Sequence, residues 1–97
     1  MCDIEYTEQA VADLQWFKKH EQNIIVDRID QRLRYEPTKA NRNRKVLRPN
    51  AIAAWELRIR DFRILYDVDV YVRIVEIKRI GEKRGNALYF RGQKEEI

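Results

Sequence analysis

Hydrophobic and charged residues alternate over most of the segment from residue 55 to residue 91. Side chains on a strand point alternately to its two faces, so this pattern predicts a sheet with one apolar and one cationic face. The positions expected on the apolar face are Trp55, Leu57, Ile59, Phe62, Ile64 and Tyr66. Those expected on the open face are Glu56, Arg58, Arg60, Arg63, Leu65 and Asp67, with a tight turn near Asp61. Guanidinium groups on one face repel one another, so this face is the candidate site for an anionic partner.

The first 36 residues show helical spacing after a short strand at residues 3–6. Thr7 is a candidate helix N-cap, and the first helix should end near His20, where a short joint leads to a second helix. The second helix should stop near Glu36, because Pro37 disfavours the helical region for the residue before it. The expected apolar stripes are Ala10, Val11, Leu14 and Phe17 in the first helix and Ile25, Ile29 and Leu33 in the second.

These elements predict one α+β domain over residues 1–97, in the order β-α-α-β-β-β. A two-helix hairpin should pack on one face of a twisted, mainly antiparallel sheet, and a short further strand is allowed at residues 88–91. Residues 37–54 form a connector whose basic first part reads as a solvated loop. Arg48 differs from the rest of that run, because it lies where the chain returns to the sheet.

The positive charge is concentrated in the second part of the chain. Residues 1–36 hold 5 basic and 8 acidic side chains, whereas residues 37–97 hold 15 basic and 8 acidic ones. A net charge of +7 in that part favours a polyanion, most simply nucleic acid. A solvated basic surface or an acidic protein partner would give the same pattern.

Composition excludes several familiar chemistries. A lone histidine, His20, and a lone cysteine, Cys2, argue against a structural zinc site and a Ser-His-Asp or Cys-His site, and we expect no metal and no cofactor. His20 is better explained as a residue at a helix C-terminus. Gly81 and Gly85 match no phosphate loop. No apolar run long enough for a membrane span and no signal peptide is present, so we expect a cytoplasmic protein that does not contact a membrane.

Four short segments in a fixed order carry a family resemblance: Leu47-Arg48, then residues 55–58 (WELR), 61–66 (DFRILY) and 81–84 (GEKR), followed by Tyr89. In this order the chain resembles the RelE/ParE superfamily of bacterial type II toxins over nearly its whole length. The resemblance implies an endoribonuclease that cleaves mRNA on the ribosome without histidine. It also implies a cognate antitoxin as partner, which we expect to be acidic and amphipathic in its C-terminal part.

The resemblance assigns candidate roles residue by residue. The catalytic candidates are Arg63, Lys83, Arg84, Tyr89 and Glu56, and the RNA-binding candidates are Arg48, Arg58 and Arg60. The sequence does not decide whether Lys83 or Arg84 occupies the family's basic position after the glycine. The implied reaction is attack of a ribose 2′-OH on the adjacent phosphate, with Tyr89 or Lys83 as acid-base group because arginine is a poor proton donor.

Glu56 departs from the family pattern, in which a basic residue often occupies this position. It is either a general base or a group that neutralises Arg58, and we favour the second reading. Two other functions stay open, inhibition of DNA gyrase as in ParE-like toxins and an inactive module that binds antitoxin or nucleic acid.

Overall fold

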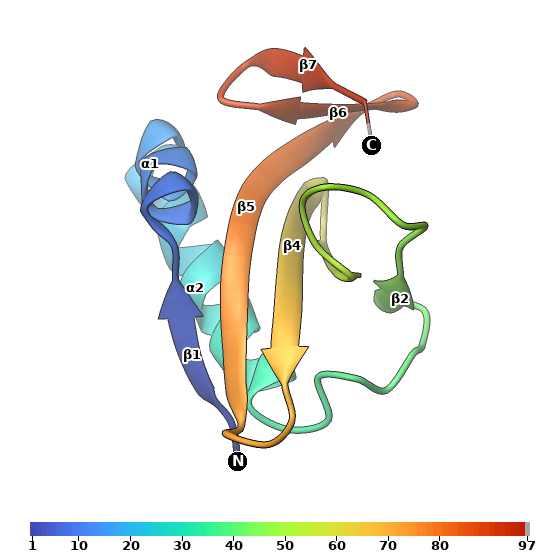
Figure 1. The fold of residues 1–97 in the computed structure, drawn as a ribbon. Coiled ribbons are helices and arrows are strands. Elements are labelled where there is room, and N and C mark those ends of the chain that lie inside the picture. The colour runs from blue at the N-terminus through green and yellow to red at the C-terminus, as the bar shows by residue number, and fades with distance from the viewer. Residues whose placement is uncertain (97) are drawn as a thin grey trace.

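The computed structural model describes residues 1–96 and shows two helices packed against one face of a twisted sheet (Figure 1). Its elements are β1 (Asp3–Tyr6), α1 (Glu8–Trp16), α2 (Lys19–Leu33), β2 (Arg44–Val46), β3 (Trp55–Ile59), β4 (Phe62–Asp69), β5 (Ile74–Arg84), β6 (Ala87–Phe90) and β7 (Gln93–Glu95). The predicted α+β fold, with both helices before the main strands, is confirmed.

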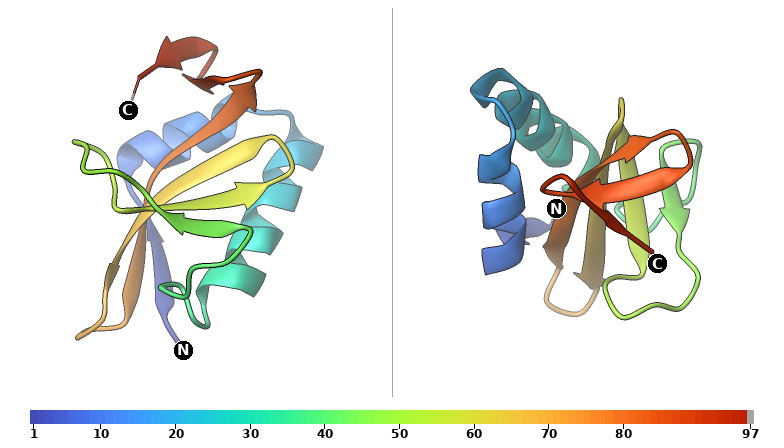
Figure 2. Two further views of the ribbon diagram at one scale, coloured as in Figure 1. Left: turned by 90° about the vertical axis from the view of Figure 1, so that its right-hand side faces the viewer. Right: turned by 90° about the horizontal axis from the view of Figure 1, so that it is seen from above.

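The sheet has the strand order β2-β3-β4-β5-β6-β7, and β1 pairs with β5. Among the described strands, β1 and β5 form the one parallel pair, and the other pairs are antiparallel. Strand β5 is 11 residues long and joins two regions. Its first part lies between β1 and β4, and its last three residues pair with β6. Figure 2 shows both helices on the same side of this sheet and the β6–β7 hairpin at its far end.

The main core lies between the helices and the sheet. Ile25, Ile29 and Leu33 of α2 are fully buried, as the helical stripe predicts. The apolar face of the sheet supplies Leu57, Ile59, Phe62, Ile64 and Tyr66 to the same core, and Trp55 packs against it. The predicted strand register is therefore confirmed. A shift by one residue would have moved this whole set to the open face.

Helix α1 begins as predicted but differs from the prediction along its length. The Thr7 hydroxyl accepts a hydrogen bond from the Ala10 amide at 3.1 Å and donates to the Lys78 carbonyl at 3.0 Å. Val11, expected in the apolar stripe, is 39% exposed, whereas Asp13 is fully buried. The stripe is displaced because Asp13 turns toward two arginines of the C-terminal region, Arg79 and Arg91.

The boundaries of both helices lie before the predicted ones. Helix α1 ends at Trp16 rather than near His20, because Phe17 adopts an extended backbone with ψ of 161°. Helix α2 begins at Lys19, so His20 lies in its first turn and not at a helix C-terminus. The Glu21 carboxylate accepts a hydrogen bond from the Lys18 amide at 3.0 Å and so stabilises this start. Neither helix in residues 1–96 is apolar and long enough to span a membrane.

The connector between α2 and β3 contains a strand that the sequence did not predict. Strand β2 has three residues and pairs with β3, with Lys45 opposite Glu56. After β2, the segment of residues 47–54 folds over the open face of the sheet. Leu47, Ile52 and Ala53 pack there in a second apolar cluster around Leu65. The open face is therefore partly covered by the chain itself.

Candidate functional site

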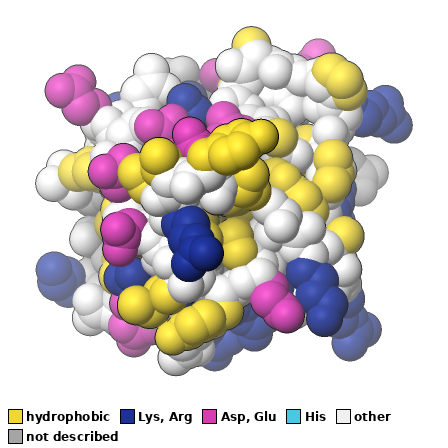
Figure 3. Space-filling view, turned by 60° about the horizontal axis from the view of Figure 1, so that its bottom comes forward, with side chains coloured by type: hydrophobic (Ala, Val, Ile, Leu, Met, Phe, Trp, Pro, Cys, Tyr) yellow, Lys and Arg dark blue, Asp and Glu magenta, His cyan; other side chains and the backbone are white. Residues whose placement is uncertain are grey.

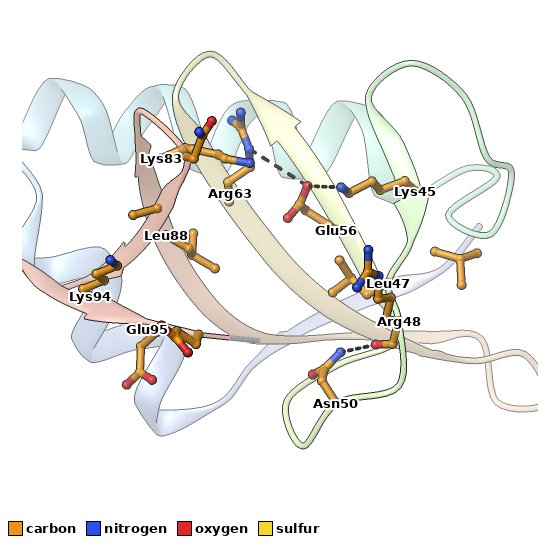
Figure 4. A pocket seen from close by; sticks show the side chains of 14 residues that line it. Lys45, Leu47, Arg48, Asn50, Glu56, Arg63, Lys83, Leu88, Lys94 and Glu95 are labelled. Carbon is orange, nitrogen blue, oxygen red and sulfur yellow. Dashed lines mark hydrogen bonds and ion pairs between the residues drawn. The ribbon is translucent and has the colours of Figure 1, made fainter.

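A cleft of about 850 Å³ opens on the side of the sheet away from the helices (Figure 4). Its walls come from β2 with the loop that follows it and from the β5–β6–β7 region. Its floor holds Glu56 and Arg63, which project from β3 and β4. The cationic residues that line it are Lys45, Arg48, Arg63, Lys83 and Lys94, and the acidic ones are Glu56, Glu95 and Glu96. The cleft thus combines a cationic lining with a carboxylate at its floor.

Arg63 is held firmly at the floor of the cleft. Its Nη1 donates hydrogen bonds to the carbonyl oxygens of Arg60, at 2.8 Å, and Phe62, at 2.9 Å. Its Nε is buried, has no hydrogen-bond partner and lies 4.0 Å from Glu56 Oε1. Burial lowers the pKa of Arg63 below its ordinary value, and the nearby Glu56 carboxylate opposes this shift. One side of the guanidinium is therefore fixed by the backbone, and the Nε side keeps a free donor.

Glu56 lies among three cations. Its Oε1 is 3.5 Å from Arg58 Nε and 3.8 Å from Lys45 Nζ, in addition to the Arg63 contact. Arg58 and Arg63 are direct partners across the β3–β4 ladder, an arrangement in which like charges destabilise the sheet. The carboxylate offsets this repulsion. These distances are compatible with the interpretation that Glu56 neutralises Arg58. They place Lys45 and Arg63 close enough for Glu56 to compensate their charges as well.

The loop after β2 is built around the side chain of Asn50. Its Nδ2 donates to the carbonyl oxygens of Arg48, at 2.7 Å, and Ala53, at 2.9 Å. Its Oδ1 accepts from the amides of Ile52 and Ala53. These four bonds fix the loop that carries Arg48 at the rim of the cleft. Figure 4 shows Asn50 and Arg48 on the wall opposite Lys83 and Lys94.

The opposite wall is attached to the rest of the fold at two places. A Cβ atom at Gly81 would lie 2.5 Å from the Tyr89 carbonyl oxygen and 2.7 Å from Phe90 Cδ1, so only glycine allows β6 to approach β5 this closely. The buried carboxylate of Asp13 accepts hydrogen bonds from Arg79 at 2.7 and 3.1 Å. It also binds Arg91 Nε, beyond the end of β6, at 3.0 Å. Helix α1 thereby holds the turn that leads into β7.

Comparison with solved structures identifies the fold that carries this cleft. The toxin–antitoxin complex RelBE2 from Mycobacterium tuberculosis contains a chain that superposes with a TM-score of 0.68 at 22% identity, covering 84% of this chain and 98% of that one. The archaeal RelE–RelB complex from Pyrococcus horikoshii gives 0.69 at 23% identity, with 89% and 98% covered. The E. coli RelBE complex gives 0.66 at 15% identity, with 87% and 99% covered. The chain has the RelE fold. No family model and no curated protein matches its sequence.

The RelE fold brings four of the expected site residues into the cleft, namely Arg48, Glu56, Arg63 and Lys83. Arg58 lies beside them through its contact with Glu56. Arg60 does not line the cleft, because it occupies the β3–β4 turn with a left-handed φ of 53° and does not continue the strand's alternation. Its expected place on the face with Glu56 and Arg58 is therefore corrected.

Strand geometry separates Lys83 from Arg84 and Tyr89. Lys83 pairs with Leu88, whereas Tyr89 pairs with Glu82 on the other face of the β5–β6 hairpin. Arg84 binds Glu82 at 2.6 Å, and its guanidinium carbon lies 5.0 Å from the centre of the Tyr89 ring. Arg84 and Tyr89 are not among the residues lining the cleft, contrary to the expected grouping, because neighbouring residues on a strand face opposite ways.

Several cleft residues were not predicted from the sequence. Lys45 was assigned to a solvated loop, although it lies in the wall strand β2 opposite Glu56, and its Nζ reaches within 3.8 Å of Glu56 Oε1 at the floor of the cleft. Asn50 gave a weak signal as a turn-forming residue after Pro49. Lys94 and Glu95 reach the cleft through β7, a three-residue strand without an apolar alternation. No group of three or more His, Cys, Asp and Glu side chains within residues 1–96 could hold a metal ion.

A second surface feature lies at the other end of the sheet, around the β4–β5 turn. Tyr71 is 95% exposed, and its neighbours Val70 and Val72 are about 60% exposed. The turn is fixed by Asp69, whose Oδ1 accepts from the amides of Tyr71 and Val72. Figure 3 shows hydrophobic side chains gathered across this end, with acidic and basic groups between them. The two ends of the sheet therefore differ in character, one cationic and hollow, the other apolar.

Proposed function

We propose that the chain is the toxin of a type II toxin–antitoxin system and acts as an endoribonuclease on mRNA at the ribosome. The observation that carries the proposal is the placement of Arg63. Its guanidinium is fixed by two backbone carbonyls at the floor of a cationic cleft, in a chain with the RelE fold. Fixed donors at a site of developing negative charge stabilise a transition state without reorganisation.

The proposed reaction is a transfer within the RNA backbone. A ribose 2′-OH gives its proton to solvent water and its oxygen attacks the adjacent phosphorus. The bond to the 5′-oxygen breaks, and that oxygen takes up a proton from a group of the protein. The products are a 2′,3′-cyclic phosphate and a 5′-OH. Arg63 binds the nonbridging oxygens as their charge grows. Lys83, which lines the cleft, is the better placed proton donor to the leaving oxygen, since Tyr89 does not line it.

Replacement of Arg63 tests this function directly. Removing a charge-assisted donor costs about 1.5–3 kcal/mol, so Arg63→Ala should lower RNA cleavage roughly ten- to a hundredfold or more. Arg63→Lys should recover part of the loss, because lysine keeps the charge but not the planar fork. The measurement is growth arrest with mapping of cellular RNA 5′ ends at matched expression.

Arg42→Ala is the matched control, because Arg42 is exposed and does not line the cleft. This variant should arrest growth and produce new RNA ends as the parent does. Equal toxicity of the parent and Arg63→Ala would remove Arg63 from the mechanism. Toxicity without new RNA ends would point to DNA gyrase as the target. If the parent is not toxic, the remaining alternative is an inactive module that binds antitoxin or nucleic acid.

For the partner, we propose an antitoxin whose acidic, amphipathic segment binds this chain. The cleft offers five cationic side chains against three acidic ones, and the exposed residues around Tyr71 offer apolar contact. Charge makes association salt-dependent, whereas apolar burial does not. The affinity should therefore fall as salt rises, and Lys45→Ala should flatten this dependence.

Tyr71→Ser should instead weaken binding of the antitoxin by a similar factor at every salt concentration. Isothermal titration at low and high salt measures both effects. An affinity that is flat with salt for the parent would show that apolar contacts alone carry the interface.

A further inference from the structure

The surroundings of Glu56 resemble an anion-binding site whose occupant is part of the protein. The Glu56 side chain is 10% exposed, and Lys45, Arg58 and Arg63 approach its Oε1 from β2, β3 and β4. Three adjacent strands thus direct a cation at a single oxygen atom. Without Glu56, the neighbouring Lys45, Arg58 and Arg63 would be left as mutually repelling charges.

The contacts around Glu56 are long for ion pairs. They measure 3.5–4.0 Å, whereas charge-assisted N–H···O bonds are typically about 2.7–2.9 Å. The buried Arg63 Nε has no hydrogen-bond partner at all. The one hydrogen bond among these contacts runs from Arg58 Nε to Glu56 Oε1 at 3.5 Å. Glu56 therefore compensates the charge of the three cations while holding their donors weakly. An anion that displaces Glu56 would take over these weakly held donors.

We propose that Glu56 is an internal counter-anion, which keeps Lys45, Arg58 and Arg63 gathered in the free protein and yields them to RNA phosphates on binding. The identification of the ligand as RNA rests on the proposed function. A single phosphate must compete with Glu56 for the same cations and gains little. A strand that also engages Arg48 and Lys83 gains enough to displace it, so the cleft selects a polyanionic strand over a mononucleotide.

Glu56→Gln tests the proposal because it removes the charge and keeps the shape. The ligand is a short single-stranded RNA that is 2′-O-methylated at every ribose, so attack by a 2′-OH cannot occur. Its affinity, measured by fluorescence anisotropy, should rise at least about fourfold and up to roughly three-hundredfold, the range that a unit charge some 5 Å from a phosphate gives between bulk-water and protein-surface screening. AMP should show weak binding to the parent and a clear gain with Glu56→Gln.

Glu82→Gln is the matched control. It removes the same charge from β5, but Glu82 binds Arg84 on the face away from the cleft and does not line it. This variant should bind the methylated RNA within about twofold of the parent, as surface substitutions generally do. If Glu82→Gln gained as much RNA affinity as Glu56→Gln, the change in net charge alone would explain the effect, and the proposal would be overturned.

A measurement on the unaltered protein covers the case in which Glu56→Gln folds poorly. The Arg63 Nε–Hε resonance should move when methylated RNA is added, because its neighbour changes from a carboxylate at 4.0 Å to a bound phosphate. An unmoved resonance in the RNA-bound protein would overturn the counter-anion role. So would equal RNA affinities of the parent and Glu56→Gln, including the case in which neither binds.

Cleavage of unmodified RNA separates this inference from the proposed function. If Glu56→Gln binds methylated RNA as the parent does but loses cleavage, Glu56 is a general base and the counter-anion role fails. If the parent cleaves no RNA on ribosomes while Glu56→Gln binds methylated RNA more tightly, the nuclease function fails and the counter-anion role stands.

Discussion

Asp13→Asn should destabilise the fold more than a substitution on a helix surface normally does. The Asp13 carboxylate is fully buried in α1 and binds Arg79 Nε at 2.7 Å, Arg79 Nη2 at 3.1 Å and Arg91 Nε at 3.0 Å. It also accepts a hydrogen bond from the Ile80 amide at 3.0 Å. Asparagine has one acceptor oxygen, no charge, and an NH₂ group that would face the arginine donors.

Breaking a buried ion pair on one side costs about 3–5 kcal/mol, since the remaining charge stays buried and uncompensated. The Arg91 side chain is 46% exposed and can turn to water, whereas that of Arg79 is only 15% exposed. The loss should therefore lie near the lower end, about 3 kcal/mol. For a domain of this size that corresponds to a fall in Tm of roughly 12–24 °C.

Urea unfolding followed by tryptophan fluorescence measures this loss, because Trp16 in α1 and Trp55 in β3 report on two parts of the fold. Asp30→Asn is the matched control. Asp30 pairs with Arg34 one helical turn away at 3.0 Å, but its side chain is 54% exposed, so its loss should cost about 0.3–0.5 kcal/mol. If Asp13→Asn unfolds within about 1 kcal/mol of the parent, the buried cluster does not hold α1 to the C-terminal hairpin.

Three further outcomes follow from the structure. Gly81→Ala should destabilise the protein by at least about 1–3 kcal/mol in urea unfolding, because the new methyl group would overlap the Phe90 ring. An unchanged midpoint of the urea unfolding curve would contradict this packing. Lys83→Ala should weaken RNA binding and cleavage about tenfold. Arg84→Ala removes the same charge from the other face and should change both less than about twofold. Equal losses in the two variants would refute the assignment of Lys83 to the cleft. Burial, aided by the charge of Asp30, raises the pKa of Tyr6 from 10.0 to about 12. The stability that this neutral phenol contributes is therefore complete below pH 10 and is lost as the pH rises through 12. Tyr6→Phe should flatten that decline, and an unchanged decline in the variant would exclude Tyr6 as its source.

The sequence by itself determined the secondary structure wherever an apolar pattern was long enough. The stripe of Ile25, Ile29 and Leu33 and the alternation from residue 55 onward predicted α2, the main strands and their register, because burying one face allows a single assignment. It also identified Arg63 as a residue of the open face. These features depend on periodicity within one element, which is visible along the chain.

Tertiary structure decided what depends on contacts between distant segments. Strands β2 and β7 are three residues each and carry no apolar alternation, so their pairing partners define them, and with them the positions of Lys45 and Lys94 in the cleft. The burial of Asp13 could not be read from α1, because its arginine partners lie 66 or more residues further on. The choice between Lys83 and Arg84 likewise required the pairing of β5 with β6, since adjacent residues on a strand face opposite sides and the sequence does not show which side is the cleft.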